Sequence, residues 1–122
     1  MNRAVWIIAV ALVAVAVSGC TRKGQSAKLA AEQLQRSFAK ADASVTQQVA
    51  QASTALQAGN YSQAIQTMNR VVQTQPVDQA QKQAVSTLIH QTRQAIQQNP
   101  QLNSPQLYKA MSELVERAYG EN

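Results

Sequence analysis

Residues 27–58 show an uninterrupted helical pattern, the longest in the sequence. The stretch contains no proline or glycine, and its larger apolar residues recur every three or four positions. This spacing places about one apolar residue per turn on the same side of an α-helix, so it predicts a single long helix with a narrow apolar stripe. Gly59 and Asn60 tolerate the backbone angles that end a helix. The predicted stripe consists of Leu34, Phe38, Ala41, Val45, Val49, Ala52 and Leu56.

Three further helices are expected after the first, over residues 62–74, 78–98 and 105–119. Pro76 ends the first of these, because the residue before a proline is pushed out of the helical region. Ser104 and Pro105 are typical of a helix start, as N-cap and first helical residue. The connections are short and favour antiparallel neighbours. The sequence therefore predicts one all-α domain over residues 27–122, a small antiparallel bundle or array of about four helices with a long first helix.

The composition agrees with a helical fold. Hydrophobic residues make up 45% of the chain, but aromatic residues only 4%, whereas β-strands prefer aromatic and β-branched side chains. The formal net charge is +5, and basic residues such as Arg22 and Lys23 lie early in the chain. We interpret the early basic residues as part of a solvated stem, with attraction to an anionic bilayer surface as the alternative.

The first 19 residues have the organisation of a secretory signal. Arg3 is followed by an uncharged apolar run over residues 4–17 and by two small residues, Ser18 and Gly19. The run is too short to span a hydrocarbon core, which takes about 20 residues, and it has the length of the apolar part of a signal peptide. We therefore expect residues 1–19 to be removed.

The sequence Val17-Ser18-Gly19-Cys20 resembles the lipobox of bacterial lipoproteins. In that family the cysteine receives a diacylglyceryl group, and a dedicated signal peptidase cuts directly before it. The resemblance implies lipidation of Cys20, the only cysteine of the chain, and lasting attachment to a membrane through several acyl chains. The alternative is an ordinary cleaved signal with a coincidental cysteine.

The resemblance also bears on location. Thr21 follows the cysteine and is not the aspartate that resembles an inner-membrane retention signal, so the family's sorting rule favours the outer membrane, facing the periplasm, if the source has two membranes. Residues 20–26 then form the lipidated cysteine and a polar stem, which would reach at most about 20 Å when extended.

Residues 55–76 resemble the second half of a tetratricopeptide repeat. The matching positions are the turn glycine, the aromatic, small and bulky residues and the closing proline: Gly59, Tyr61, Ala64, Met68, Val71 and Pro76. The first half, from about residue 43, departs from the pattern at Gln48 and Gln51, and the segment after residue 76 does not repeat it. A solenoid needs about three repeats to bury a continuous core, so we interpret the match as a helix-hairpin packing solution. The alternative is a degenerate interaction module.

The sequence contains no recognisable constellation of catalytic residues. His90 is the only histidine, and no acidic residue lies within one turn of it, so we expect a structural or surface role for it. Glu113 lies three residues before Glu116 and can pair with Arg117. Neither a glycine-rich phosphate loop nor a basic-aromatic pattern for stacking nucleotides occurs. We expect no catalytic residue, metal, cofactor, small-molecule substrate or nucleic-acid partner, and hence no enzyme.

The sequence therefore favours a lipid-anchored envelope protein with a structural or protein-interaction role. The apolar stripe is narrower than a core-facing face, so we expect it to engage a second helix, from another copy of the chain or from an envelope protein. The candidate contact residues are Leu34, Phe38, Val45, Val49, Tyr61 and Met68. Two alternatives stay open: a peptide-binding adaptor built on the tetratricopeptide-like hairpin, and a lipoprotein that binds glycan or the membrane surface.

Overall fold

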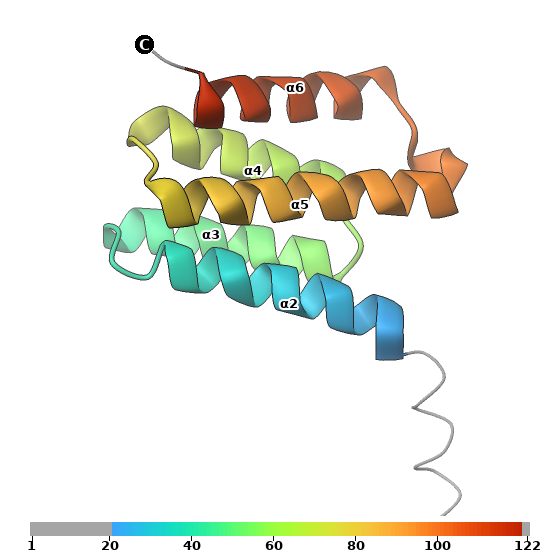
Figure 1. The fold of residues 1–122 in the computed structure, drawn as a ribbon, viewed down its shortest axis with the longest axis horizontal. Coiled ribbons are helices and arrows are strands. Elements are labelled where there is room, and N and C mark those ends of the chain that lie inside the picture. The colour runs from blue at the N-terminus through green and yellow to red at the C-terminus, as the bar shows by residue number, and fades with distance from the viewer. Residues whose placement is uncertain (1–20, 121–122) are drawn as a thin grey trace, which may run out of the picture.

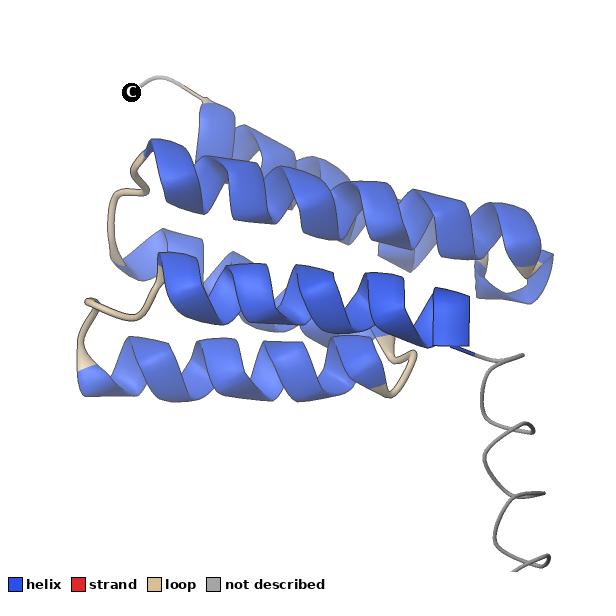
Figure 2. Ribbon diagram, turned by 60° about the horizontal axis from the view of Figure 1, so that its bottom comes forward, coloured by secondary structure: helices blue, strands red, loops and turns tan. Residues whose placement is uncertain are grey.

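The structure is a computed structural model that describes residues 21–120, with side chains described from residue 26 onward. The predicted signal peptide, residues 1–19, and the predicted lipidation site Cys20 lie outside the described residues. Every regular element between residues 21 and 120 is helical, which confirms the all-α prediction (Figures 1 and 2). In chain order the elements are α2 (Thr21–Ser37), α3 (Ala43–Gln57), α4 (Tyr61–Thr74), α5 (Gln79–Gln98), the 3-10 turn η2 (Pro100–Leu102) and α6 (Pro105–Tyr119).

The prediction of one long first helix is wrong, because residues 38–42 separate α2 from α3. A tight turn follows α2, in which the Ala41 N–H donates to the Phe38 carbonyl at 3.1 Å. Asp42 then has an extended backbone, with φ −58° and ψ 157°. This reversal lets the two halves of the predicted stripe pack within one core. A single helix would have left most of that stripe exposed to water.

The helices form a closed ring in which each packs mainly on two others. Helix α2 packs on α3, α3 on α4, α4 on α6, α6 on α5, and α5 on α2. In Figure 1, α2 and α5 lie in front of α3 and α4, and α6 covers the remaining side. Helices α4 and α5 follow one another in the sequence but share little contact, because the connection between them crosses from one layer to the other.

The core lies inside this ring and receives side chains from all five α-helices. Its largest fully buried side chains include Leu34, Phe38, Leu56, Ile65, Met68, Leu88 and Leu114. Buried alanines lie between them, including Ala31, Ala52, Ala64 and Ala84. Small residues let neighbouring helices approach closely, so large side chains can fill the centre.

Three side-chain caps set where the later helices begin. The side chains of Asn60, Asp78 and Ser104 each accept a hydrogen bond from the backbone N–H three residues further on, at 3.3, 2.8 and 3.1 Å. Gln81 completes a capping box with Asp78 and also donates from Nε2 to the Ser37 carbonyl at 3.2 Å. This second bond joins the start of α5 to the end of α2. The caps explain why the three later helices start within one residue of the predicted positions.

The antiparallel order gives the bundle two distinct ends (Figures 1 and 2). The near end contains the start of α2, the α3–α4 turn, the end of α5, η2 and the start of α6. The far end contains the α2–α3 and α4–α5 connections and the end of α6.

Candidate functional site

A polar groove of about 290 Å³ lies between α4 and α6. Its lining residues are Gln66, Asn69, Gln73, Gln106, Lys109, Ala110, Glu113 and Arg117. On each helix most of these residues are three or four positions apart, so their side chains share one face. Two larger grooves are less polar: one of about 470 Å³ beside α3 and the start of α4, and one of about 670 Å³ at the far end. The α4–α6 groove holds the most developed side-chain hydrogen-bond network and is therefore the candidate site.

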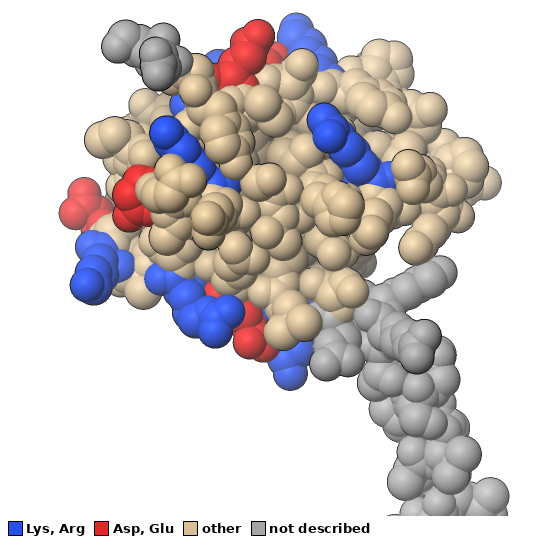
Figure 3. Space-filling model, viewed as in Figure 1, with Lys and Arg blue, Asp and Glu red and all other residues tan. Residues whose placement is uncertain are grey.

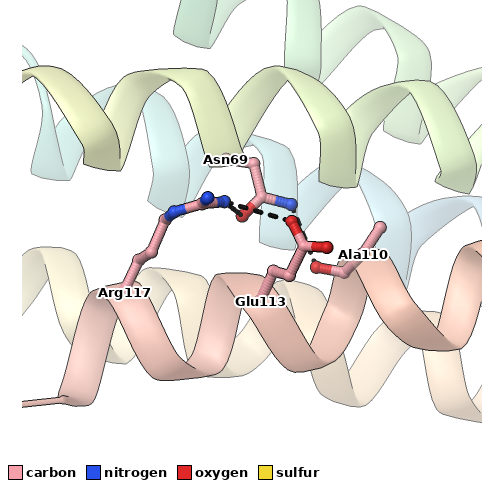
Figure 4. Close-up of polar contacts among 4 residues, drawn as sticks. All are labelled: Asn69, Ala110, Glu113 and Arg117. Carbon is pink, nitrogen blue, oxygen red and sulfur yellow. Dashed lines mark hydrogen bonds and ion pairs between the residues drawn. The ribbon is translucent and has the colours of Figure 1, made fainter.

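Asn69 is the buried centre of the groove. Its Nδ2 donates to the backbone carbonyl of Ala110 at 3.0 Å, and its Oδ1 accepts from Arg117 Nη1 at 3.1 Å (Figure 4). Only 7% of Asn69 is exposed to solvent. A buried amide is stable only when its polar atoms are paired, so this side chain fixes α6 against α4.

Arg117 is held at the groove rim by three groups. Besides Asn69, it contacts Glu113 Oε2 at 3.3 Å, one turn earlier on α6 (Figure 4). In the amide orientation that pairs donors with acceptors, Gln73 Oε1 accepts from Arg117 Nη2 at 3.1 Å. Both partners of the ion pair are more than a third exposed, so the pair itself contributes a few tenths of a kcal/mol. Its main effect is to hold the guanidinium in one position.

The groove can recognise hydrogen-bonding groups. Asn69, Gln73, Glu113 and Arg117 are held in place by hydrogen bonds, and the exposed Gln66, Gln106 and Lys109 add further donors and acceptors to its lining. Residues 21–120 contain no group of three metal-ligating side chains that could hold an ion. His90 is exposed on α5 and is not among the residues that line the groove. The arrangement therefore suits binding of a polar segment.

The structure places five of the six predicted contact residues in the core. Their exposed fractions are 0% for Leu34, Phe38 and Met68, 1% for Val49 and 6% for Val45. The prediction that Leu34, Phe38, Val45 and Val49 form a free contact stripe is wrong, because the chain folds back and covers the stripe itself. Met68, from the predicted hairpin surface, is also buried. The sixth residue, Tyr61, is half-buried at the start of α4, and burial raises the pKa of its phenol above the usual range.

The predicted α3–α4 hairpin is present. Its turn passes through Gly59, which has a φ of +83°, and the Asn60 N–H donates to the Ala55 carbonyl at 2.8 Å. Ala64, at the small position of the pattern, is fully buried. Helix α6 packs on α4, and α5 packs mainly on α2 and α6, so α5 and α6 do not stack on the hairpin as a second copy of it.

The sequence interpretation did not single out Asn69 or Gln73, although it noted the Glu113 and Arg117 pair. One signal was available for Asn69, which lies one turn after Ile65 on the apolar side of α4. A polar residue at a core-facing position needs a partner. The sequence does not show that this partner comes from α6, 41 and 48 residues later.

No protein-family model, curated protein or solved structure matches this chain. Among the described helices, none is both long and apolar enough to cross a membrane.

Proposed function

We propose that the protein is a lipid-anchored envelope protein whose helical domain has a structural or protein-interaction role. The observation that supports this proposal is that helix α2 already includes Thr21, the residue after the lipobox-like sequence that ends at Cys20. Residues 21–26 are helical and rise about 9 Å, less than half the reach of the extended stem expected from the sequence. An acylated Cys20 would thus hold the domain close to the bilayer.

The α4–α6 groove is the proposed contact surface for a protein partner. Asn69, Gln73, Glu113 and Arg117 are held by hydrogen bonds within the chain, so contacts to these groups would cost little side-chain freedom. Polar main-chain and side-chain groups of another envelope protein fit this chemistry. This surface replaces the stripe on the first helix, which is buried.

Intact mass spectrometry of the membrane-fraction protein tests the anchor. The wild-type chain is expected to start at Cys20 and to carry the added mass of a diacylglyceryl group and an acyl chain. Cys20→Ala removes this mass, and a Cys20→Ala chain that also carries Ser26→Cys is the matched control, because its thiol lies outside the lipobox. An unmodified thiol in a chain cut elsewhere would remove the anchor from the proposal.

Site-specific crosslinking tests the partner surface. A photoreactive residue at Gln66 or Lys109 lies in the groove, whereas the same residue at the exposed Arg93 on α5 is the control. We expect a discrete crosslinked envelope protein from the groove positions and none from position 93, with Arg117→Ala weakening the product. Equal products from all three positions would contradict a partner surface in this groove.

A further inference from the structure

The charged residues of the bundle are distributed unequally between its two ends. At the near end, residues 55–64 and 94–107 contain no charged residue. The start of α2, residues 21–28, adds three basic residues, Arg22, Lys23 and Lys28, and no acidic one. The near end is therefore formed by uncharged polar groups beside a short basic segment.

The far end has the opposite character. Ten charged residues lie in this half of the bundle, five of each sign: Glu32, Arg36, Lys40, Asp42, Arg70, Asp78, Lys82, Glu113, Glu116 and Arg117. They include all five acidic residues found between residues 21 and 120. Figure 3 shows charged side chains concentrated toward the end with the α2–α3 and α4–α5 connections, and few at the other end. Acidic groups are thus kept away from the end where α2 begins.

An exposed apolar side chain also occurs at the near end. Three large apolar residues are exposed in the described chain: Leu29 at 54%, Tyr108 at 47% and Tyr119 at 43%. Tyr108 lies in the first turn of α6, which starts at the near end, whereas Leu29 lies at the middle of α2. Tyr119 lies at the far end, where its hydroxyl donates to the Lys82 carbonyl at 2.6 Å. An exposed tyrosine has an apolar ring and a polar tip, which suits the level of lipid headgroups.

We propose that the near end is a membrane-contact surface and that the bundle stands on an anionic phospholipid bilayer with its far end directed away. The inference rests on the proposed function, because acyl chains at Cys20 would fix the start of α2 to that bilayer. The basic start of α2 is attracted by anionic headgroups, and the uncharged amides of the α3–α4 turn and η2 can hydrogen-bond them without repulsion. Since α5 has 20 residues, the far end lies about 30 Å from the surface.

The two exposed tyrosines provide a matched test. The only tryptophan of the chain, Trp6, lies in the segment that we expect to be removed, so Tyr108→Trp and Tyr119→Trp would each give a single tryptophan in the mature lipoprotein. Each acylated variant is reconstituted in phosphatidylglycerol-containing vesicles, with or without brominated acyl chains that quench nearby tryptophan. Far-UV circular dichroism checks that both variants keep the helical fold. We expect a loss of emission in brominated vesicles for Tyr108→Trp and unchanged emission for Tyr119→Trp.

Vesicle flotation separates failure of this orientation from failure of the anchor. If the protein floats with the vesicles and mass spectrometry shows acylated Cys20, but the two variants are quenched alike or neither is quenched, the orientation is wrong and the anchor stands. If Cys20 is unmodified and the protein does not float, the proposed function fails and the orientation fails with it.

Charge reversal provides a second variant pair at exposed positions. Lys28→Glu lies near the start of α2, and Lys40→Glu lies at the far end. Placed in the Tyr108→Trp background, Lys28→Glu is expected to reduce quenching in anionic vesicles, whereas Lys40→Glu leaves it unchanged. Equal effects of the two substitutions would overturn the proposed contact surface.

Discussion

Phe38 is the side chain on which the reversal between α2 and α3 depends most directly. It is fully buried directly after α2 ends, and the Ala41 N–H donates to its carbonyl. We expect Phe38→Ala to lower the free energy of unfolding by about 3–5 kcal/mol, because the cavity left behind cannot close fully. Leu29→Ala, at an exposed position of α2, should change it by less than about 0.5 kcal/mol. Urea unfolding followed by circular dichroism measures both, and equal effects would contradict the buried position of Phe38.

Among the amide side chains of the α4–α6 groove, we expect Asn69 to contribute most to the free energy of unfolding. Asn69→Ala leaves the Ala110 carbonyl and the Arg117 guanidinium without their shared partner, so we expect a loss of about 1–3 kcal/mol in unfolding free energy. Gln66→Ala, at an exposed position of the same groove, is the control. A double-mutant cycle with Arg117→Ala should show coupling, since the two side chains are bonded at 3.1 Å. Additive effects would contradict the bond.

The partly buried phenol of Tyr61 should make the stability of the protein depend on pH in the alkaline range. Burial raises the pKa of its phenol in the folded state above the ordinary value near 10, so the folded state binds the proton more tightly than the unfolded state. The contribution of the Tyr61 phenol to the free energy of unfolding is present in full while the pH is below the ordinary pKa. It is lost as the pH rises through the higher pKa of the folded state. Tyr61→Phe should therefore lose less stability than wild type above about pH 10, as measured by urea unfolding at several pH values. Parallel pH profiles would contradict this prediction.

At the scale of elements, the α3–α4 hairpin depends on Gly59. Its φ of +83° lies in a region that residues with a Cβ rarely adopt, although nothing lies within 4 Å of where that Cβ would be. We expect Gly59→Ala to cost about 1 kcal/mol through backbone strain alone, and Gly59→Asn to cost less, because asparagine tolerates such angles better. Thermal unfolding of the two variants measures the difference. An equal cost for both would indicate that the turn relaxes.

Two element boundaries show how local and distant interactions compete. The start of α6 at Pro105 agrees with the prediction because Ser104 caps it within the same segment. The break at residues 38–42 contains no glycine or proline, and its one local signal is Asp42, a residue type that favours N-cap positions but makes no side-chain cap hydrogen bond here. Interrupting a helix loses a few hydrogen bonds, each of about 0.5–1.5 kcal/mol net. Burying a large apolar side chain contributes about 1.5–3 kcal/mol, and the reversal buries several, so packing outweighs helix continuity.

At the scale of the whole molecule, the closed ring predicts cooperative unfolding. Each α-helix packs mainly on two others around a single core, so loss of one exposes its neighbours to water. We expect far-UV circular dichroism and tyrosine fluorescence to report the same unfolding midpoint. A deletion of residues 105–122 should remove the transition altogether, because it uncovers the face of α4 that contains Asn69 and removes the buried Leu114. Separate midpoints for the two probes would contradict a single cooperative unit.

The helical class, the three later helices and the α3–α4 turn could all be predicted from short stretches of the sequence. Caps such as Asp78 and the backbone freedom of Gly59 act within a few residues, so their effects can be read from a short segment. Signals of this kind did not reveal that the first predicted helix folds back, that its stripe becomes core, or that Asn69 meets Arg117 across a groove. These features arise only in the packed fold, because each depends on side chains that are distant in the chain and exclude water together. The free energy gained by excluding water exists only once all five helices are packed.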